Sequence, residues 1–170
     1  MGLFIWTLLA NSNRIEASDF ELSGRLEQLA RQGSPIGKYM LARRLLADEN
    51  RRPGDVRAAI GWLQSAASEG IVDAQATLAG LVETGEIGVT QDAQRAGRLY
   101  LDAYLNGSAV ARFAIINEGR ERDQEVMRAM QSLLAEQGFY TSTVDGLFGG
   151  NTQRAFERAL QARFLRKRES

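Results

Sequence analysis

The chain has 170 residues, 44% of them hydrophobic, which is enough to bury one core or two. Its 21 basic and 21 acidic residues cancel, so no net field draws it to nucleic acid or to an acidic surface. Cysteine and histidine are both absent, which excludes thiol catalysis, disulfides, a zinc site of the usual ligand type and any triad that needs imidazole. The carboxylates are spread over polar helix faces, as on a solvated surface. We therefore expect no metal, no cofactor and no catalytic residues.

The first apolar run, from Leu3 to Ala10, is too short to span a bilayer, which needs about 20 apolar residues. Three interpretations are equally open for it. The first interpretation is the end of a secretory signal, although no basic residue precedes the run. The second is the remainder of a longer sequence, and the third is an irregular cap on a helical array. Residues 1–17 are thus treated as an N-terminal apolar segment, and no transmembrane span is expected in the chain.

The next stretch, residues 18–32, carries apolar side chains at helical spacing and ends at Gly33. Glycines then recur at Gly70 and Gly107, and the two intervals are equal, since 70 − 33 = 37 and 107 − 70 = 37. Apolar residues share registers relative to these glycines, as Leu41, Leu78 and Ile115 do. A fixed period of this length indicates a solenoid of helix pairs that begins half-way through a pair.

Within each period the pattern predicts a first helix, a polar loop and a second helix. The first helices are expected at Lys38–Ala47, Asp73–Glu83 and Ala109–Glu118. Asp55 and Asp92 are placed to cap second helices, because a short carboxylate accepts the backbone N–H groups at a helix start. The periodic glycines end these helices, because glycine readily takes the left-handed conformation.

The segments AIGWLQSAASEG (59–70) and DAQATLAG (73–80) resemble the Sel-one-like repeats, relatives of the tetratricopeptide repeat. The resemblance covers roughly residues 24–119. It implies a right-handed stack of helix pairs that serves as an adaptor surface for a protein partner, without chemistry of its own. We expect this domain at 18–122, with Trp62 in its core.

A second pattern begins on the helix expected between Asp123 and Gly138. Its marks are Met130-Gln131, Leu134, Gly138-Phe139-Tyr140, the string DGLFG at 145–149, Thr152, Ala155, Phe156 and Leu160-Gln161. These residues resemble the small peptidoglycan-binding domain of bacterial cell-wall proteins. Leu160 stands in place of the usual aromatic residue, and Gly150 in place of a common proline.

This second resemblance implies a three-helix bundle that holds wall glycan or stem peptide in a shallow groove. The ligand-binding residues it indicates are Tyr140, Asp145, Asn151, Thr152 and Arg154. The same motif also has a purely structural interpretation. Asp145 can hydrogen-bond its own turn, Gly146 and Gly149 can take positive φ, and Phe148 can fill a small core.

Only residues 123–137 are available both as the last repeat helix and as the first helix of the second pattern. We therefore predict that one face of this helix, with Val126, Met130 and Leu133, packs on Phe113 and Ile116. Met127 and Leu134 should then turn toward Phe148 and Phe156. The tail after Gln161 is basic, as a solvated helix end often is; contact with anionic wall polymer or phospholipid headgroups is the alternative.

The sequence thus predicts an all-α protein: a short right-handed helix-pair solenoid fused to a small three-helix peptidoglycan-binding-like bundle at 123–170. The expected function is that of a non-catalytic adaptor of the periplasm or cell envelope, which binds peptidoglycan and an unidentified protein partner, and no nucleic acid. Two alternatives stay open. One is a pure protein-interaction scaffold whose C-terminal domain has lost glycan binding; the other is an accessory fragment of a cell-wall hydrolase system.

Overall fold

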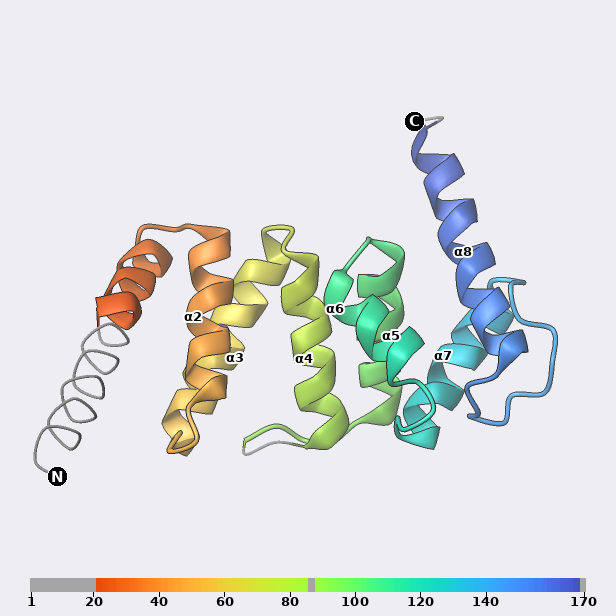
Figure 1. Cartoon of the computed structure of the whole chain (residues 1–170), viewed down its shortest axis with the longest axis horizontal. Helices are drawn as coiled ribbons and strands as arrows, with labels where there is room; N and C mark the ends of the chain where they lie inside the picture. Colours follow the sequence, from red (N-terminus) through yellow and green to blue (C-terminus); the bar gives the residue numbers. More distant parts are fainter. Residues whose placement is uncertain (1–20, 86–87, 169–170) are drawn as a thin grey trace, which may run out of the picture. The chain divides into compact units, whose positions relative to one another are not determined.

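The computed structural model describes residues 21–85 and 88–168 (Figure 1). Every regular element in these residues is helical and no strand occurs among them, which confirms the all-α prediction for this part of the chain. The apolar segment predicted at residues 1–17 lies outside the described residues. The chain divides into two compact units, Met1–Glu69 and Gly70–Ser170. The domain boundary predicted after residue 122 therefore falls inside the second unit.

In the first unit a helix at residues 21–31 is followed by α2 (Pro35–Ala47) and α3 (Pro53–Ser68), and α2 packs on α3. The Ser34 hydroxyl caps α2 by accepting a hydrogen bond from the N–H of Gly37 at 3.1 Å. One cluster of the core in this unit contains Leu26, Ala30 and Leu41, with Leu45 and Trp62 packed against them. Val56 and Leu63 on α3 are also fully buried. Trp62 is partly buried, so it covers the core rather than forming its centre.

The start of α3 differs from the prediction at Asp55. Arg52 is the N-cap and Asp55 is the third helical residue, whose Oδ2 accepts a hydrogen bond from the N–H of Arg52 at 2.8 Å. Pro53 explains the earlier start, because its fixed φ suits the first turn of a helix. Asp92 does cap its helix, and its carboxylate accepts the N–H of Arg95 at 2.9 Å.

The second unit contains α4 (Val72–Thr84), α5 (Ala93–Leu105), α6 (Ala109–Arg112), the π-helical turn η1 (Phe113–Asn117), α7 (Gln124–Glu136) and α8 (Gly150–Arg168). Helix α5 is central, because it packs on α4, α6, α7 and α8. One continuous core runs through the unit, and its largest fully buried members include Leu101, Ile115, Met127, Met130, Leu134 and Phe156.

The periodic glycines follow helices and adopt the left-handed conformation. Gly33, Gly70 and Gly107 have φ of 89°, 95° and 88°, and Gly138 after α7 has φ of 79°. Positive φ is readily available only to glycine, because it has no Cβ. The helix ends expected from the 37-residue spacing therefore lie where the sequence places them.

Helices α5 and α7 approach each other closely at Gly97. A Cβ built on Gly97 would lie 2.7 Å from the Cβ of Ala129 and 3.0 Å from the carbonyl oxygen of Val126. Farther along α5, the ring of Tyr104 meets the ring of Phe156 on α8 edge-on, with centroids 5.3 Å apart. Helix α7 therefore packs mainly against α5.

The predicted contact between α7 and Phe113 is wrong. Phe113 is 57% exposed, whereas the next two residues, Ala114 and Ile115, are buried. The buried face of this segment is formed by Ala111, Ala114 and Ile115, which are spaced three and four residues apart, and Phe113 lies on the opposite side. The π-helical turn η1, which begins at Phe113, also interrupts the single helix expected at Ala109–Glu118.

Candidate functional site

The candidate site lies around the loop at residues 139–149, between α7 and α8. Within this loop Asp145 closes its own turn, because its Oδ1 accepts a hydrogen bond from the N–H of Leu147 at 2.8 Å. Gly146 has φ of 76°, and a Cβ there would lie 2.5 Å from both Cγ and the carbonyl oxygen of Gln124. The turn thus requires glycine at 146 for its conformation and for space.

One face of α7 holds this turn. Gln124, Arg128 and Gln131 are four and three residues apart, so they lie on the same side of the helix. The Nε2 of Gln124 donates to the carbonyl oxygen of Asp145 at 2.9 Å, and the guanidinium of Arg128 donates to the same oxygen at 3.4 Å. The turn is therefore bound to the helix through its backbone.

Gln131 is the centre of the arrangement and is fully buried. Its Oε1 accepts the N–H of Gly146 at 2.8 Å. Its Nε2 lies 3.0–3.2 Å from four acceptors, namely Tyr140 Oη, Asp145 Oδ1, the carbonyl oxygen of Leu147 and Thr152 Oγ1. An amide has only two hydrogens to donate, so these acceptors share them. The sequence marked Gln131 as part of a motif but not as a site residue; a polar residue between Met130 and Leu134 on an apolar face was the available signal.

An open cavity of about 550 Å³ lies between this loop and the start of α8. The five ligand-binding residues indicated by the sequence all line it, together with neighbouring loop residues: Tyr140, Asp145, Asn151, Thr152 and Arg154. The structure therefore brings together residues that are up to 14 positions apart, since 154 − 140 = 14.

Two of these residues belong to the floor of the cavity. Tyr140 is 5% exposed, and its hydroxyl donates to the carbonyl oxygen of Thr143 at 2.9 Å. Thr152 is 1% exposed, and its hydroxyl lies 3.0 Å from the carbonyl oxygen of Leu147. Tyr140 was indicated as a ligand-binding residue, but its side chain is buried and its hydroxyl is already hydrogen-bonded within the loop.

The polar groups that reach solvent come from the other three residues. The N–H of Leu147 and the amide of Gln131 hydrogen-bond Asp145 and hold the pKa of its carboxyl below the usual range, so it is ionised at neutral pH. Asn151 and Arg154 are exposed on the first turns of α8, where the Arg154 guanidinium donates to Asn151 Oδ1 at 2.6 Å. The cavity therefore offers a carboxylate, an amide and a guanidinium to a polar ligand.

The two remaining motif residues behave differently. Phe148 is partly buried and packs against the core of the unit. Gly149 does not adopt positive φ, so that prediction is wrong, and a Cβ on it would meet no atom within 4 Å. Gly149 and Gly150 both line the cavity, which leaves this part of its wall without side chains.

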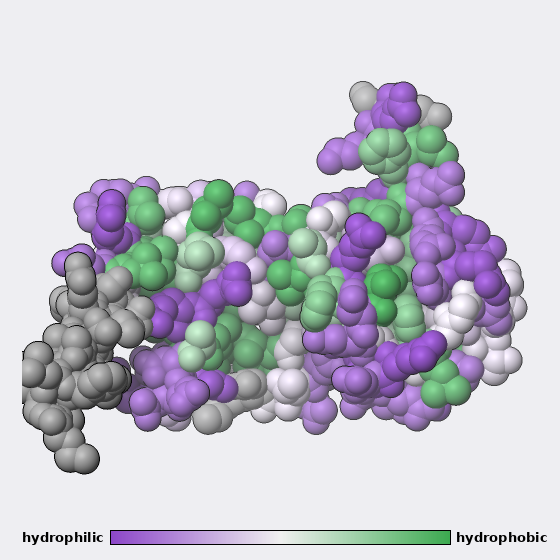
Figure 2. Space-filling view, viewed as in Figure 1, coloured by the Kyte–Doolittle hydropathy of each residue, from purple (hydrophilic) through white to green (hydrophobic). Residues whose placement is uncertain are grey.

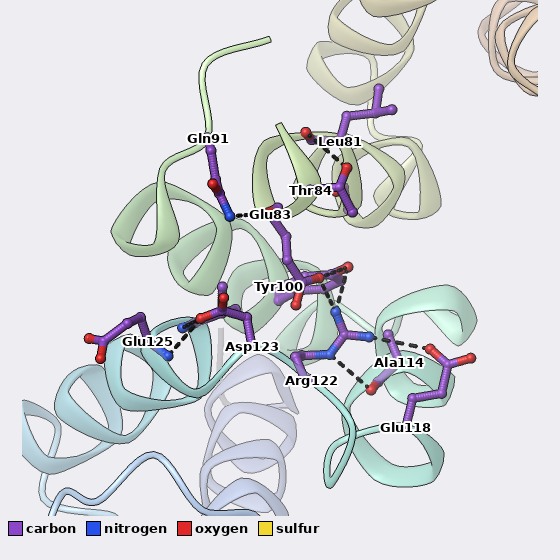
Figure 3. A network of polar contacts seen from close by, with 12 residues as sticks. Leu81, Glu83, Thr84, Gln91, Tyr100, Ala114, Glu118, Arg122, Asp123 and Glu125 are labelled. Carbon is purple, nitrogen blue, oxygen red and sulfur yellow. Dashed lines mark hydrogen bonds and ion pairs between the residues drawn. The ribbon is translucent and has the colours of Figure 1, made fainter. Parts of the chain in front are cut away.

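A second polar cluster surrounds Arg122, in the turn before α7 (Figure 3). Its guanidinium pairs with the carboxylate of Glu83 and donates to the hydroxyl of Tyr100 at 2.9 Å. The Tyr100 hydroxyl donates to Glu83 Oε2 at 3.0 Å, and the Arg122 Nε donates to the carbonyl oxygen of Ala114 at 3.2 Å. The guanidinium also lies 4.5 Å from the centroid of the Tyr100 ring. The cluster thus joins α4, α5, η1 and the turn.

The burial and pairing of these side chains indicate that the cluster stabilises the fold. The side chains of Arg122 and Glu83 are only 7% and 11% exposed, and they satisfy each other. Burial, with the nearby Glu83 carboxylate adding to it, raises the pKa of the Tyr100 hydroxyl, so the phenol stays neutral. The sequence did not single out Arg122, because the stretch GRERD around it has several charges and no periodicity to mark one of them.

Among the described residues, no group of three or more histidine, cysteine, aspartate or glutamate residues is placed to hold a metal ion. None of the described helices combines the length and the apolar character needed to cross a membrane. Comparison of the chain with protein-family models, with curated proteins and with solved structures gives no match.

Proposed function

We propose that this protein is a non-catalytic adaptor of the bacterial cell envelope, which binds peptidoglycan at the cavity beside α8. The observation that supports this function is the grouping of Asp145, Asn151 and Arg154 around an open cavity of about 550 Å³. The floor of this cavity is already held in place by the hydrogen bonds of Gln131 to Asp145 and Gly146. Few convergent polar groups around a preformed hollow are typical of ligand sites. The stem peptide and glycan of the wall carry the carboxylates, amides and hydroxyls that such groups bind.

Co-sedimentation with purified sacculi tests the proposal. The N151A/R154A variant should pellet at least tenfold less than the natural chain, because it removes the two exposed polar side chains and leaves the buried floor unchanged. The matched control is Q153A/E157A, which breaks an exposed side-chain hydrogen bond of 3.0 Å on the same helix between residues that do not line the cavity. Pelleting that both double variants reduce equally would contradict binding at this cavity.

A steric variant gives an independent readout. Gly149→Trp places a large side chain at the cavity wall, where an added Cβ meets no atom within 4 Å. The circular dichroism spectrum should stay unchanged while pelleting with sacculi is lost. Unchanged pelleting of this variant would place wall binding elsewhere on the chain.

A second candidate function is a protein-interaction scaffold in which the motif only builds the fold. It is favoured by a specific observation: Gln131, Tyr140 and Thr152 all direct their polar atoms into the loop rather than toward solvent. Absence of pelleting by the natural chain, with a native circular dichroism spectrum, would favour this scaffold function over wall binding.

For the protein partner, the proposal is that it docks on the helical repeats. Exposed apolar side chains on the first unit support this, since Ile36 is 64% exposed and Met40 is 41% exposed, both on α2. A photo-crosslinking amino acid at Ile36 should capture one defined adduct in cells. The same probe at Gln64, an exposed polar position on α3, should capture none.

A further inference from the structure

Helix α8 continues for two turns beyond the core. Ala159 is its last buried residue, and every residue from 163 to 168 is exposed. Two large apolar side chains lie in this stretch, Phe164 at 62% and Leu165 at 50% exposure. Figure 1 shows this end of α8 extending past α5 and α7, and Figure 2 shows hydrophobic and hydrophilic residues side by side on it. Nothing in the core requires this extension.

The same stretch is strongly basic in a chain whose net charge is zero. Arg163, Arg166, Lys167 and Arg168 fall within six residues. The hydrogen bonds and ring contact of the three arginines involve neutral groups: the side chain of Asn106, the carbonyl oxygen of Ala162 and the ring of Phe164. Arg163 also interacts electrostatically with the carboxylate of Asp102. A helix C-terminus favours cations, but this preference acts on the last turn only and explains neither Phe164 nor Leu165.

A cavity of about 500 Å³ borders this end of α8, next to the end of α5. Its apolar residues are Leu105, Leu160 and Phe164, and its basic residues are Arg163, Arg166 and Lys167. Leu165 is not among the residues that line it, because it lies about 100° around the helix from Phe164. A peptide bound in the cavity would therefore cover Phe164 and leave Leu165 in water. A membrane surface in which the helix end is immersed would cover both side chains.

We propose that the end of α8, residues 160–168, binds the surface of a bilayer that contains anionic phospholipid. The basic side chains contact the phosphate groups, and Phe164 and Leu165 enter the boundary between headgroups and acyl chains. Charge complementarity is the basis of this assignment, because each basic residue near an anionic membrane adds to its attraction. The site lies apart from the proposed wall-binding cavity, so the two functions can fail separately.

Vesicle flotation with the full chain tests the proposal. The protein should float with vesicles that contain phosphatidylglycerol and not with vesicles of phosphatidylcholine alone. The R166Q/K167Q/R168Q variant should lose about a hundredfold in apparent affinity. The matched control, R57Q/R95Q/R120Q, removes the same number of positive charges from exposed positions elsewhere and should bind within about twofold of the natural chain.

The apolar part of the proposal has its own readout. Because the chain contains no cysteine, Leu165→Cys can be labelled at one site with a polarity-sensitive fluorophore. Its emission should shift to the blue on addition of phosphatidylglycerol vesicles, whereas the same label at Gln153→Cys, an exposed position on the first half of α8, should not respond.

Three results would overturn the assignment. The first is equal flotation with both kinds of vesicle, and the second is unchanged affinity of the triple glutamine variant. The third is tight binding of poly-glutamate by a chain that ignores vesicles, which would assign this surface to an acidic protein instead. Loss of pelleting with sacculi has no bearing on any of them, because the vesicles contain no wall material.

Discussion

The ring of Phe148 lies directly against Gly119. A Cβ built on Gly119 would come within 2.8 Å of Cγ of Phe148 and within 2.2 Å of the carbonyl oxygen of Ile115. The turn before α7 and the loop before α8 are therefore in contact. This contact joins residues on both sides of the boundary that the sequence suggested after residue 122, and it belongs to the continuous core of the second unit.

Gly119→Ala should destabilise the protein by about 1–3 kcal/mol, because the new methyl group must displace an aromatic ring and a backbone carbonyl. Urea unfolding followed by circular dichroism measures the change. Gly61→Ala is the matched control, since a Cβ there meets no atom within 4 Å on the exposed side of α3. It should stabilise the chain by up to about 1 kcal/mol through helix propensity. Equal changes in the free energy of unfolding for the two substitutions would show that the Phe148 ring moves aside without cost.

Gln131→Leu should lower the free energy of unfolding by about 2–4 kcal/mol. It should also make the loop at residues 139–149 more mobile. The reason is that the buried N–H of Gly146 and the acceptors around the amide lose their partner, at roughly 1–3 kcal/mol for each unsatisfied group. Hydrogen exchange of the Gly146 and Leu147 amides checks this directly, because both should exchange faster in the variant. If the Gly146 amide stays protected from exchange in the variant, a water molecule has replaced the glutamine as its hydrogen-bond partner without loss of stability.

Unfolding stability should fall as the pH rises above about 10. The buried Tyr100 hydroxyl has a pKa above its ordinary value of 10.0, chiefly because burial disfavours the phenolate. Above that ordinary value the unfolded chain releases a proton that the folded chain keeps. This contribution to stability is therefore complete below pH 10 and declines above it, by about 1.4 kcal/mol per pH unit for one tyrosine.

The control for this pH dependence is Tyr100→Phe. It lowers stability at every pH, because the bonds to Glu83 and Arg122 are lost, but it should reduce the slope above pH 10. Some slope should remain, since burial also raises the pKa of Tyr104. An identical slope in the natural chain and the variant would contradict the assignment to Tyr100.

Trp62→Ala should destabilise the first unit by about 2 kcal/mol, below the 3–5 kcal/mol that removing a fully buried tryptophan costs. The smaller value follows from the partial burial of Trp62 against Leu26, Ala30 and Leu41. Leu41→Ala is the comparison. Because Leu41 is only 4% exposed, this substitution should lower the free energy of unfolding more than Trp62→Ala does. A larger loss from Trp62→Ala than from Leu41→Ala would show Trp62 to be the main core residue.

The sequence predicted best what depends on local chemistry. The positive φ at Gly33, Gly70 and Gly107 and the cap at Asp92 follow from residue type and spacing alone. These features are short-range, so a pattern of a few residues specifies them. The five residues indicated for ligand binding line one cavity, but their role in binding stays a prediction.

Features that depend on distant parts of the chain escaped prediction. Which face of the segment after Gly107 is buried is decided by the helices packed on it, so the exposure of Phe113 escaped prediction. The π-helical turn that begins at Phe113 has no residue pattern that marks it either. The pairing of Arg122 with Glu83 joins residues 39 positions apart, since 122 − 83 = 39, and sequence periodicity cannot reveal it. The sequence also did not predict the burial of Tyr140, whose hydroxyl accepts a hydrogen bond from Gln131 on α7.

The hold of α7 on the loop at residues 139–149 has a thermodynamic consequence. Gln124, Arg128 and Gln131 immobilise the Asp145 turn during folding, so its conformational entropy is already lost before any ligand arrives. A ligand at the cavity then restricts only the exposed side chains, at about 0.5–1.5 kcal/mol for each one it orders. Association is accordingly expected to follow diffusion and docking without a preceding loop rearrangement, which gives single-exponential binding kinetics.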